Sequence, residues 1–397
     1  MKRNSLFLMF PLSFFPRGNG NPARFSPGKS GQAWNLRNFS FLFVFFSVLN
    51  FHSSFSQNLS AYTNIRNEFY IFEDSFTHQL DYLPPISYKI GGNSIAFIDN
   101  TNTFRIYQYG ALATPIKGIV TDYAVSNDLV LVRTPGSIYV FDEGQLNLLT
   151  RFVGPYVLGD SVVGFIDFAS RDLLAYHNGA IKIIKQGVVD LAASFLAVGG
   201  NLFAFKTYDN DFEIYYNDSV YHQQTEFPQQ VRAGNNVVAY LDQYDEGLRV
   251  FYKGETKTIE SFSPRSYFVG NDLIAYINHD GDFKIFWNGS VYQIGNYNLT
   301  KLEVRDNLVI YSDRLNYLYV FYNGKSYPLE NFIPQQINAR QSTLYYYDQN
   351  NRLKIFSEGK ETDMPMETYV SVSNDYDVIK LQLQGNQFRF FSRGKTY

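Results

Sequence analysis

The 397-residue chain contains no cysteine. This absence excludes disulfide bonds, thiolate metal sites, a cysteine nucleophile and a lipid-anchored N-terminal cysteine. A chain without thiols is compatible with any redox compartment, and packing alone must stabilise its fold. Charged residues are also scarce, at 18%, but the apolar share of 45% is ordinary. The composition therefore indicates a globular protein rather than a disordered one.

Apolar runs long enough to form a permanent transmembrane helix are also missing. The densest run, FSFLFVFFSVL, covers 11 residues at 39–49, which is too short to span a bilayer. It suits the apolar region of a signal peptide, with Arg37 as its positive flank. Ser54 and Ser56 then form a small-x-small cleavage pattern, which makes Gln57 the expected mature N-terminus. The pattern resembles secretory signals of Bacteroidetes-type bacteria.

The predicted organisation is a signal peptide with a long N-terminal extension at 1–56 and a repeat domain at 57–397. Thirty-six residues precede Arg37 and the apolar region, which is unusually long for a signal peptide. A start codon assigned too far upstream would explain this length. An uncleaved anchor or a buried core strand is the alternative for this apolar run. We expect export to the periplasm, the cell surface or the medium, with a bacterial source.

Acidic residues are absent from 1–56, which carries six basic residues. Its removal lowers Lys+Arg from 34 to 28 and leaves Asp+Glu at 37, so the mature chain carries a net charge of −9. Phosphate groups are bound by Lys/Arg surfaces. The sequence therefore argues against nucleic-acid binding and against attraction to anionic membranes.

Aromatic residues, in contrast, are abundant and periodic. They make up 18% of the chain, with 32 Tyr and 37 Phe. Such residues favour half-buried strands, so the composition favours an all-β fold. An aromatic or aliphatic residue ends a short apolar run about every 35 residues, in ten copies, at Tyr62, Phe97, Val132, Phe165, Phe205, Tyr240, Tyr276, Tyr311, Tyr346 and Leu381.

Each copy of the repeat predicts four short strands, a to d. The periodic run is strand b, and a second run such as FRIY or FKIF is strand c. Six residues after the start of strand c comes Gly in eight copies, Asp218 in one and Ser75 in the first. Asn precedes it in Asn178-Gly179, Asn288-Gly289 and Asn323-Gly324. Asn-Gly suits a type I′ turn, which joins strand c to strand d as a hairpin.

Small antiparallel sheets repeated in series are typical of a β-propeller. Residues 137–150 (SIYVFDEGQLNLLT) and 274–289 (IAYINHDGDFKIFWNG) resemble a TolB-type blade, within the broader TolB-like and WD40-like repeat class. The WD and GH signatures of WD40 repeats are missing, and Gly-Asn-Asp or Ser-Asn-Asp replaces the Ser/Pro-Asp-Gly turn expected before strand b. The resemblance is to a repeat class and assigns no functional residue to this chain.

The fold prediction is an all-β propeller of about ten four-stranded repeats, with a blade count of 8–10. A single large ring is the first choice, an open or irregular arrangement the second, and two smaller rings the third. The 40-residue step between Phe165 and Phe205 is where a boundary is hinted at. The first repeat lacks room for strand a, and the last leaves at most a stub of strand d. Terminal repeats are often atypical.

Oxygen ligands are dense in the b–c loops, for example at Asp99, Asp242 and residues 278–282 (NHDGD). Such groups could bind calcium, but the downstream Glu of a calcium loop is missing, and hairpin loops need Asx residues for their own backbone bonding. We therefore interpret these loops as turns. The remaining histidines have no metal-ligand spacing and are interpreted as surface or loop residues: His78, His177, His222 and His279.

The segments that resemble catalytic motifs each lack a required glycine. Ser161 follows Gly159-Asp160, but Val163 stands where a nucleophile elbow needs Gly. The tripeptides at 324–326 (GKS) and 394–396 (GKT) lack the earlier Gly of a phosphate loop and fall at repeat turns. The sequence assigns no catalytic, cofactor-binding or metal-ligating residue, and no cofactor.

Some aromatic residues break the repeat pattern near the c–d turn. Tyr216, Tyr252 and Trp287 could stack on a sugar or peptide, although packing between blades is the simpler interpretation. Tyr276 and Phe283, at fixed offsets, should be inter-blade core. Asn-x-Ser/Thr sequons at Asn217, Asn288 and Asn298 would matter in a eukaryotic secretory route.

The function that these observations favour is a monomeric, exported propeller that acts as a binding or scaffold module for a protein or glycan in the cell envelope. The alternative is a hydrolase or lyase with its active site in the central channel. That alternative requires His, Arg or carboxylate groups from several blades to converge.

Overall fold

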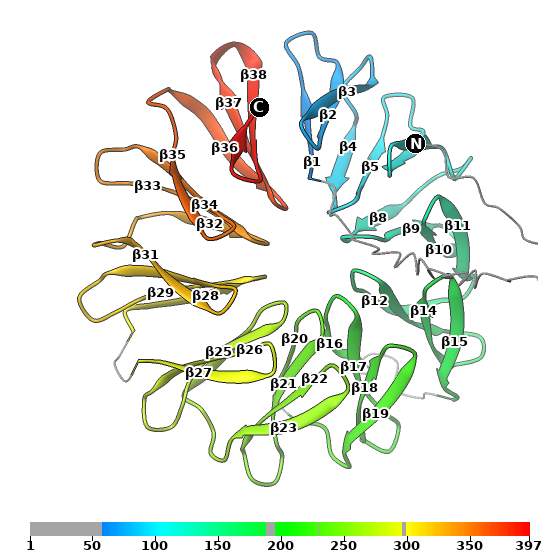
Figure 1. The fold of residues 1–397 in the computed structure, drawn as a ribbon. Helices are drawn as coiled ribbons and strands as arrows, with labels where there is room; N and C mark the ends of the chain where they lie inside the picture. The colour runs from blue at the N-terminus through cyan, green and yellow to red at the C-terminus, as the bar shows by residue number, and fades with distance from the viewer. Residues whose placement is uncertain (1–57, 188–194, 229, 296–298) are drawn as a thin grey trace, which may run out of the picture. The chain divides into compact units, whose positions relative to one another are not determined.

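The chain folds as a ring of antiparallel sheets, in a computed structural model that describes residues 58–187, 195–228, 230–295 and 299–397 (Figure 1). The predicted signal peptide, its cleavage site and Asn298 lie outside the described residues. The ring belongs to the unit Ser54–Tyr397. Strands a, b, c and d of each blade follow one another in the chain, and each pairs antiparallel with the next.

Blades 1 to 5 follow the repeat from its first copy. Their strands are β1 (Leu59–Thr63), β2 (Phe69–Glu73) and β3 (Phe76–Asp81) in blade 1; β4 (Ser87–Ile90), β5 (Ser94–Ile98), β6 (Phe104–Gln108) and β7 (Ala111–Ala113) in blade 2; β8 (Asp122–Val125), β9 (Val130–Thr134), β10 (Ser137–Asp142) and β11 (Gln145–Thr150) in blade 3; β12 (Val153–Leu158), β13 (Val162–Asp167), β14 (Leu173–His177) and β15 (Ala180–Lys185) in blade 4; β16 (Phe195–Val198), β17 (Leu202–Lys206), β18 (Phe212–Tyr216) and β19 (Ser219–Gln224) in blade 5.

Blades 6 to 10 complete the ring. Their strands are β20 (Val231–Ala233), β21 (Val237–Leu241), β22 (Leu248–Tyr252) and β23 (Glu255–Glu260) in blade 6; β24 (Ser266–Val269), β25 (Leu273–Ile277), β26 (Phe283–Trp287) and β27 (Ser290–Gly295) in blade 7; β28 (Lys301–Arg305), β29 (Leu308–Ser312), β30 (Leu318–Tyr322) and β31 (Lys325–Glu330) in blade 8; β32 (Ile337–Arg340), β33 (Thr343–Tyr347), β34 (Leu353–Ser357) and β35 (Lys360–Asp363) in blade 9; β36 (Tyr369–Asp375), β37 (Val378–Leu383), β38 (Gln387–Ser392) and β39 (Lys395–Thr396) in blade 10.

The c–d hairpins close as the sequence predicts. At all ten turns both central residues have positive φ, as in Asn288 (47°) with Gly289 (81°) and Asn217 (47°) with Asp218 (63°). Positive φ at both positions defines the type I′ turn, whose twist matches that of the paired strands. The turn chemistry thus fixes the c–d register in every blade.

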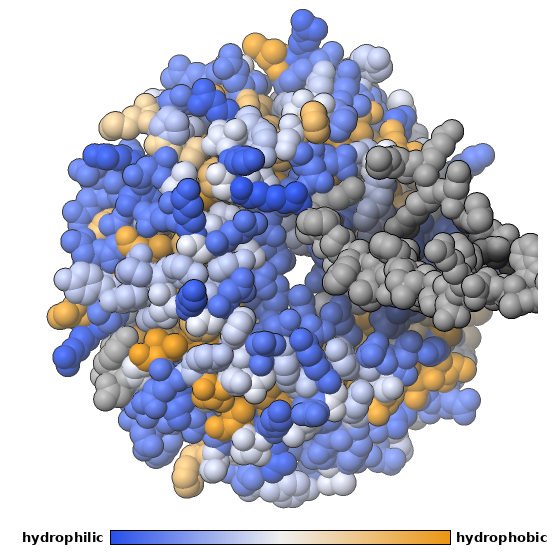
Figure 2. All heavy atoms as spheres, viewed as in Figure 1, coloured by the Kyte–Doolittle hydropathy of each residue, from blue (hydrophilic) through white to orange (hydrophobic). Residues whose placement is uncertain are grey.

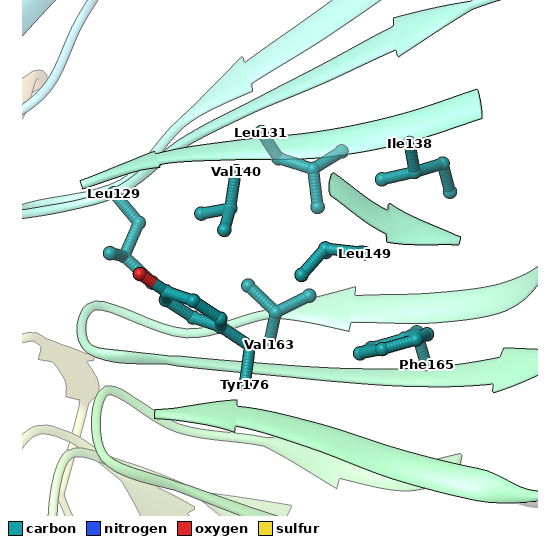
Figure 3. Packing of buried hydrophobic residues seen from close by; sticks show 8 residues of the cluster. All are labelled: Leu129, Leu131, Ile138, Val140, Leu149, Val163, Phe165 and Tyr176. Carbon is teal, nitrogen blue, oxygen red and sulfur yellow. The ribbon is translucent and has the colours of Figure 1, made fainter. Parts of the chain in front are cut away.

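The core lies between blades rather than within them. Figure 3 shows one such cluster, in which Leu131, Val140 and Leu149 of blade 3 pack against Val163, Phe165 and Tyr176 of blade 4. Side chains of a strand alternate in direction, so each blade contributes one set to the preceding interface and another to the following one. Tyr276 accordingly packs toward blade 6 and Phe283 toward blade 8, which confirms both as inter-blade core.

The ring closes between blade 10 and blade 1 without exchange of strands among the described residues. Within the described ranges, blade 1 has three strands and no strand a, and the last strand of blade 10 has two residues, both as predicted. Phe72 stacks on Phe390, with ring centroids 4.5 Å apart, beside Val378. Ser60 also donates to Asp375 at 2.7 Å. The single-ring prediction is therefore confirmed, with ten blades (Figure 1).

Candidate functional site

The a–b turns of successive blades form a hydrogen-bonded belt near the axis of the ring. The first strands of neighbouring blades contact one another, which places strand a innermost. Backbone N–H groups of one turn donate to a carbonyl of the next blade: Asn93 to Asn127, Asp160 and Ser161 to Gly200, Asn201 to Asn235, Asn235 to Asn271, Asn271 to Asp306, and Asn307 to Gln341. These main-chain bonds connect blade 2 to blade 3 and run from blade 4 to blade 9. Between blades 3 and 4, the backbone N–H of Asn127 donates to the carboxylate of Asp160 instead.

Glycine at the first position of several a–b turns, among them the Gly270-Asn271-Asp272 turn that departs from the TolB pattern, has a geometric cause. A Cβ atom on Gly199 would lie 1.6 Å from the carbonyl oxygen of Gly234, and one on Gly234 would lie 1.7 Å from that of Gly270. Real Cβ atoms do not approach so closely. Glycine at the first turn position thus allows the blades to approach closely enough for the belt to form.

Side chains of the same turns add a second ladder. Asn201 donates to Asn236 at 2.9 Å, and Asn236 donates to Asp272 at 2.9 Å. Asn271 of blade 7 donates to Asn307 of blade 8 at 3.0 Å and to Gln341 of blade 9 at 3.2 Å. One side chain therefore spans three blades, so the ring is narrow at this level. Figure 2 shows a small opening at the middle of the ring with hydrophilic residues on its border.

Carboxylates at the a–b turns of different blades interact through their charges. Burial, together with the charge of Asp306 in blade 8, raises the pKa of Asp377 in blade 10 to about 6. Burial also raises the pKa of Asp160 in blade 4, again with a contribution from Asp306. Each carboxylate accepts a backbone N–H of a neighbouring blade: Asp377 from Ser342, Asp306 from Gln341, and Asp160 from Asn127.

Two adjoining grooves lie outside this belt, on the face that carries the a–b and c–d turns. The larger has a volume of about 540 Å³ and extends over blades 2 to 4; it is lined by Tyr109, Asp128, Leu129, Asp142, Glu143, Gln145, Asn147, Ser161, Tyr176, Asn178 and Gly179. The smaller, of about 250 Å³, crosses blades 4 to 6 and is lined by Ser161, His177, Asn178, Asn201, Tyr216, Asn217 and Asn236. Ser161 and Asn178 line both, so the grooves are continuous. We call them the turn-face grooves.

The larger groove has a fixed polar wall. The buried hydroxyl of Tyr176 donates to Asp142 at 2.8 Å and accepts from Asn147 at 3.2 Å. The ring of Tyr109 is half exposed. Burial and the nearby carboxylates of Asp128 and Glu143 raise the pKa of Tyr109 to about 12. The groove thus offers carboxylate and amide oxygens beside a neutral phenol.

An ionised carboxylate, that of Asp218, contacts His177 in the lining of the smaller groove. Partial burial alone would raise the pKa of Asp218, but hydrogen bonds from Tyr215, His177 and Lys182 lower it to about 2. Tyr215 donates to Asp218 at 2.8 Å, and the His177 ring nitrogen lies 3.1 Å from the same oxygen. These contacts fix the position of the His177 ring beside Asn178 and Asn217.

A third groove, of about 700 Å³, lies on the opposite face between blades 2 and 3. Its lining is mainly apolar and includes Ile98, Ile116, Ile119 and Val120. Ile119 is 76% exposed.

The aromatic residues that break the repeat pattern act mainly in packing. Tyr216, Tyr252 and Trp287 each lie edge-on to a buried Phe of the next blade, with ring centroids 5.8, 5.5 and 6.4 Å apart. The packing interpretation is therefore confirmed. Tyr216 also contributes to the wall of the smaller groove.

The Asp-rich loops are turns, as interpreted from the sequence. Asp99 accepts the backbone N–H groups of Thr101 and Thr103, both at 2.9 Å. Asp242 likewise accepts those of Tyr244 and Asp245, at 2.8 and 3.2 Å. The main chain of each loop therefore uses its Asx oxygen as an acceptor.

The other sequence candidates have structural roles. Ser161 donates to Asn201 at 2.8 Å in the a–b belt. The GKS and GKT tripeptides fall at c–d turns. His78 and His279 are exposed, and the sequons at Asn217 and Asn288 lie in c–d turns. These positions are therefore explained by turns and surface, as the sequence suggested.

One group of ligating side chains was missed by the sequence. Asp211, Glu213 and His222 of blade 5 place one donor atom each within 4.8 Å of one another. The three residues come together because the β18–β19 hairpin register pairs Glu213 directly with His222. The spacing of nine residues has no meaning until that register is known.

The architecture defines a class of protein, the ten-bladed β-propeller. Residues 53–397 match the family model of the 10-bladed beta propeller domain, and the chain belongs to this family. No curated protein matches the chain. Among the described residues, no helix has the length and apolar character that crossing a membrane requires.

Solved structures resemble the chain distantly. The computationally designed Ika8 protein shares 13% identity at a TM-score of 0.30, covering 69% of this chain and 96% of that one. BamB from Moraxella catarrhalis shares 12% at 0.29, covering 70% and 99%. PorZ, a bacterial surface component of the type-IX secretion system of Porphyromonas gingivalis, shares 11% at 0.27, covering 86% and 58%. Likenesses this distant carry no argument about function.

Proposed function

We propose that this chain is an exported, non-catalytic propeller that binds a carbohydrate in the turn-face grooves. The observation that carries the proposal is the continuous lining of carboxylate, amide and tyrosine groups across blades 2 to 6. Sugar hydroxyls both donate and accept, and carboxylates, amides and phenols match them. Tyr109 and Tyr216 offer ring faces or edges for the apolar side of a sugar.

The acidic lining of the grooves restricts the classes of glycan that they can bind. Their lining contains Asp128, Asp142 and Glu143 but no Lys or Arg. An acidic glycan would meet like charge there, whereas a neutral or amino sugar would not. We therefore favour neutral or amino-substituted oligosaccharides over acidic glycans. A protein partner with a basic segment is the second possible ligand.

A glycan array with neutral, amino-substituted and acidic members tests this function. Asn178→Gly and Asn217→Gly remove two groove amides, and glycine retains the positive φ of the turn (48° and 47°). Loss of one side-chain hydrogen bond should weaken binding about 5- to 10-fold. Asn323→Gly, at the same turn position in blade 8, is the matched control and should bind normally. Preference for acidic glycans, or equal binding by all three variants, would contradict the proposal.

Export rests on the N-terminal sequence. The run at 39–49, the flank at Arg37 and the small residues before Gln57 support cleavage and release to the envelope or medium. N-terminal sequencing of the protein from fractionated cells should give Gln57. A cytoplasmic protein that retains residues 1–56 would contradict export. We expect the mature protein to be a monomer that does not insert into membranes. Because it is acidic, we also expect it to bind no nucleic acid.

The carboxylates at the inner a–b turns, those of Asp377, Asp306 and Asp160, favour a hydrolase or lyase as the second candidate. Asp377, with its pKa of about 6, could exchange a proton near neutral pH. We prefer the binding role because Asp377, Asp306 and Asp160 already accept backbone N–H groups. If the protein degrades a glycan that it binds and Asp377→Asn abolishes this, the enzyme hypothesis replaces the binding one.

A further inference from the structure

Blade 5 carries a cluster of ligating groups away from the turn-face grooves. Asp211 directly precedes β18, and Glu213 on β18 lies opposite His222 on β19. This end of the c–d hairpin is remote from its turn at Asn217 and Asp218. One donor atom each from Asp211, Glu213 and His222 lies within 4.8 Å of the others.

The position of Glu213 is occupied by a base in most other blades. The equivalent repeat position of strand c holds a basic residue in blades 2, 6, 7, 9 and 10: Arg105, Arg249, Lys284, Lys354 and Arg389. These bases form ion pairs with acids, such as Lys284 with Glu260 at 2.8 Å. Blade 5 inverts this charge, and Lys185 of blade 4 lies 2.8 Å from Glu213.

The inverted ion pair leaves part of the cluster unexplained. Glu213 is 5% exposed, and Lys185 contacts its Oε1 atom. Its Oε2 atom is buried and has no hydrogen-bond partner among the residues that the structure describes. A buried carboxylate oxygen without a partner is unfavourable. The cluster also brings a second acid, Asp211, and a histidine that a simple ion pair does not need.

We propose that Asp211, Glu213 and His222 bind a first-row transition-metal dication such as Zn²⁺. The carboxylate of Glu213, a carboxylate oxygen of Asp211 and a ring nitrogen of His222 would be its ligands. Two carboxylates and one imidazole suit zinc, manganese or iron, with water in the remaining positions. Calcium prefers oxygen ligands alone and should bind poorly here.

The neighbouring lysine gives the proposal a distinctive signature. Lys185 is 39% exposed at its side chain, so its ammonium can swing into solvent. Its positive charge opposes a cation at the site. Lys185→Met should therefore increase metal affinity, although it removes a native ion pair. A purely structural cluster would not respond in this way.

Calorimetric titration of the chelator-treated full chain with ZnCl₂ and with CaCl₂ tests the proposal. The wild type should bind one Zn²⁺ and no Ca²⁺. Loss of a ligand in His222→Ala or Asp211→Asn should weaken Zn²⁺ binding at least about tenfold. Lys185→Met should tighten it by several-fold. Zn²⁺ should also raise the melting temperature of the wild type but not of His222→Ala.

His279→Ala is the matched control, because His279 is another exposed histidine, in a b–c loop of blade 7. It should leave Zn²⁺ binding unchanged. Absence of Zn²⁺ binding by the wild type would overturn the proposal. Binding that survives His222→Ala and Asp211→Asn in folded protein, or that His279→Ala weakens equally, would also overturn it. Circular dichroism of each variant verifies folding.

Discussion

Single glycines set how closely neighbouring blades approach in the inner belt. A Cβ on Gly234 would overlap the carbonyl oxygen of Gly270 at 1.7 Å, an atom that cannot move without shifting the next blade. The same holds along the ring at Gly91, Gly199 and Gly270. Glycine is therefore needed at these positions for the close approach of neighbouring blades and not for the conformation of the turn.

We expect Gly234→Ala to destabilise the protein by about 2–3 kcal/mol, because overpacking forces backbone shifts. Urea unfolding followed by circular dichroism measures the change. Gly136→Ala is the control, since a Cβ there has no neighbour within 4 Å. It should be neutral or slightly stabilising. Equal stability of both variants would show that the belt tolerates wider spacing.

A second residue-scale prediction concerns Asp377. Burial raises its folded-state pKa to about 6, above the value of 3.8 for a free side chain. The folded state therefore holds more protons than the unfolded state between about pH 4 and 6. Stability contributed by this group is fully present below pH 4 and is lost as pH rises through 6.

Asp377→Asn should remove this pH dependence, because an amide cannot ionise and can still accept from Ser342. From pH 4 to pH 7, the unfolding free energy of the variant should increase relative to that of the wild type by about 1 kcal/mol or more. Urea titrations at several pH values measure it. A difference that stays flat would mean that Asp377 has an ordinary pKa.

At the scale of elements, the c–d hairpin combines a local rule with a contact from the preceding blade. Gly110 and Gly324 share a φ of +78°, so Ala is strained at both. A Cβ on Gly324 would also lie 2.8 Å from the ring of Trp287, whereas one on Gly110 meets nothing within 4 Å.

Gly324→Ala should therefore cost about 1 kcal/mol more than Gly110→Ala, the excess arising from contact with Trp287. Melting temperatures of the two variants provide the comparison. The excess should disappear when both are made in a Trp287→Leu background. If Gly110→Ala is the more damaging change, the contact with Trp287 is not what limits this turn.

Elements also show how far the sequence could be read. Strands b and c and the c–d turns were predictable because period-two hydrophobicity and Asn-Gly signals are local. The turn-face grooves were not, because they join residues of neighbouring blades, such as Asp128 and Asn178. The Asp211–Glu213–His222 cluster needed a hairpin register that the sequence leaves open.

At the scale of the whole molecule, the seam between blades 10 and 1 differs from the others. Its buried apolar cluster consists of Phe72, Val378 and Phe390, fewer residues than at any other interface of the described ring. Polar contacts supplement it, as when Lys380 donates to the carbonyl of Ala61 at 2.8 Å. Side chains rather than a shared sheet hold this seam.

Phe390→Ala should loosen the seam selectively. Native-state hydrogen exchange should show lost protection in β1 to β3, because Phe390 stacks on Phe72 of blade 1. Phe391→Ala, one residue along β38, faces blade 9, and its loss should fall on β32 to β35 instead. Loss spread equally over all blades in both variants would indicate that the ring unfolds as one cooperative unit.

The sequence by itself determined the blade. Apolar alternation, turn residues with positive φ and a repeat that cannot bury its own face are local properties, and ten copies of them lead to a propeller. The tertiary structure decided what the copies make together. Closure of the ring, the raised pKa of Asp377, the turn-face grooves and the ligating cluster all arise from groups that become neighbours, or become buried, only when blades or strands pack together.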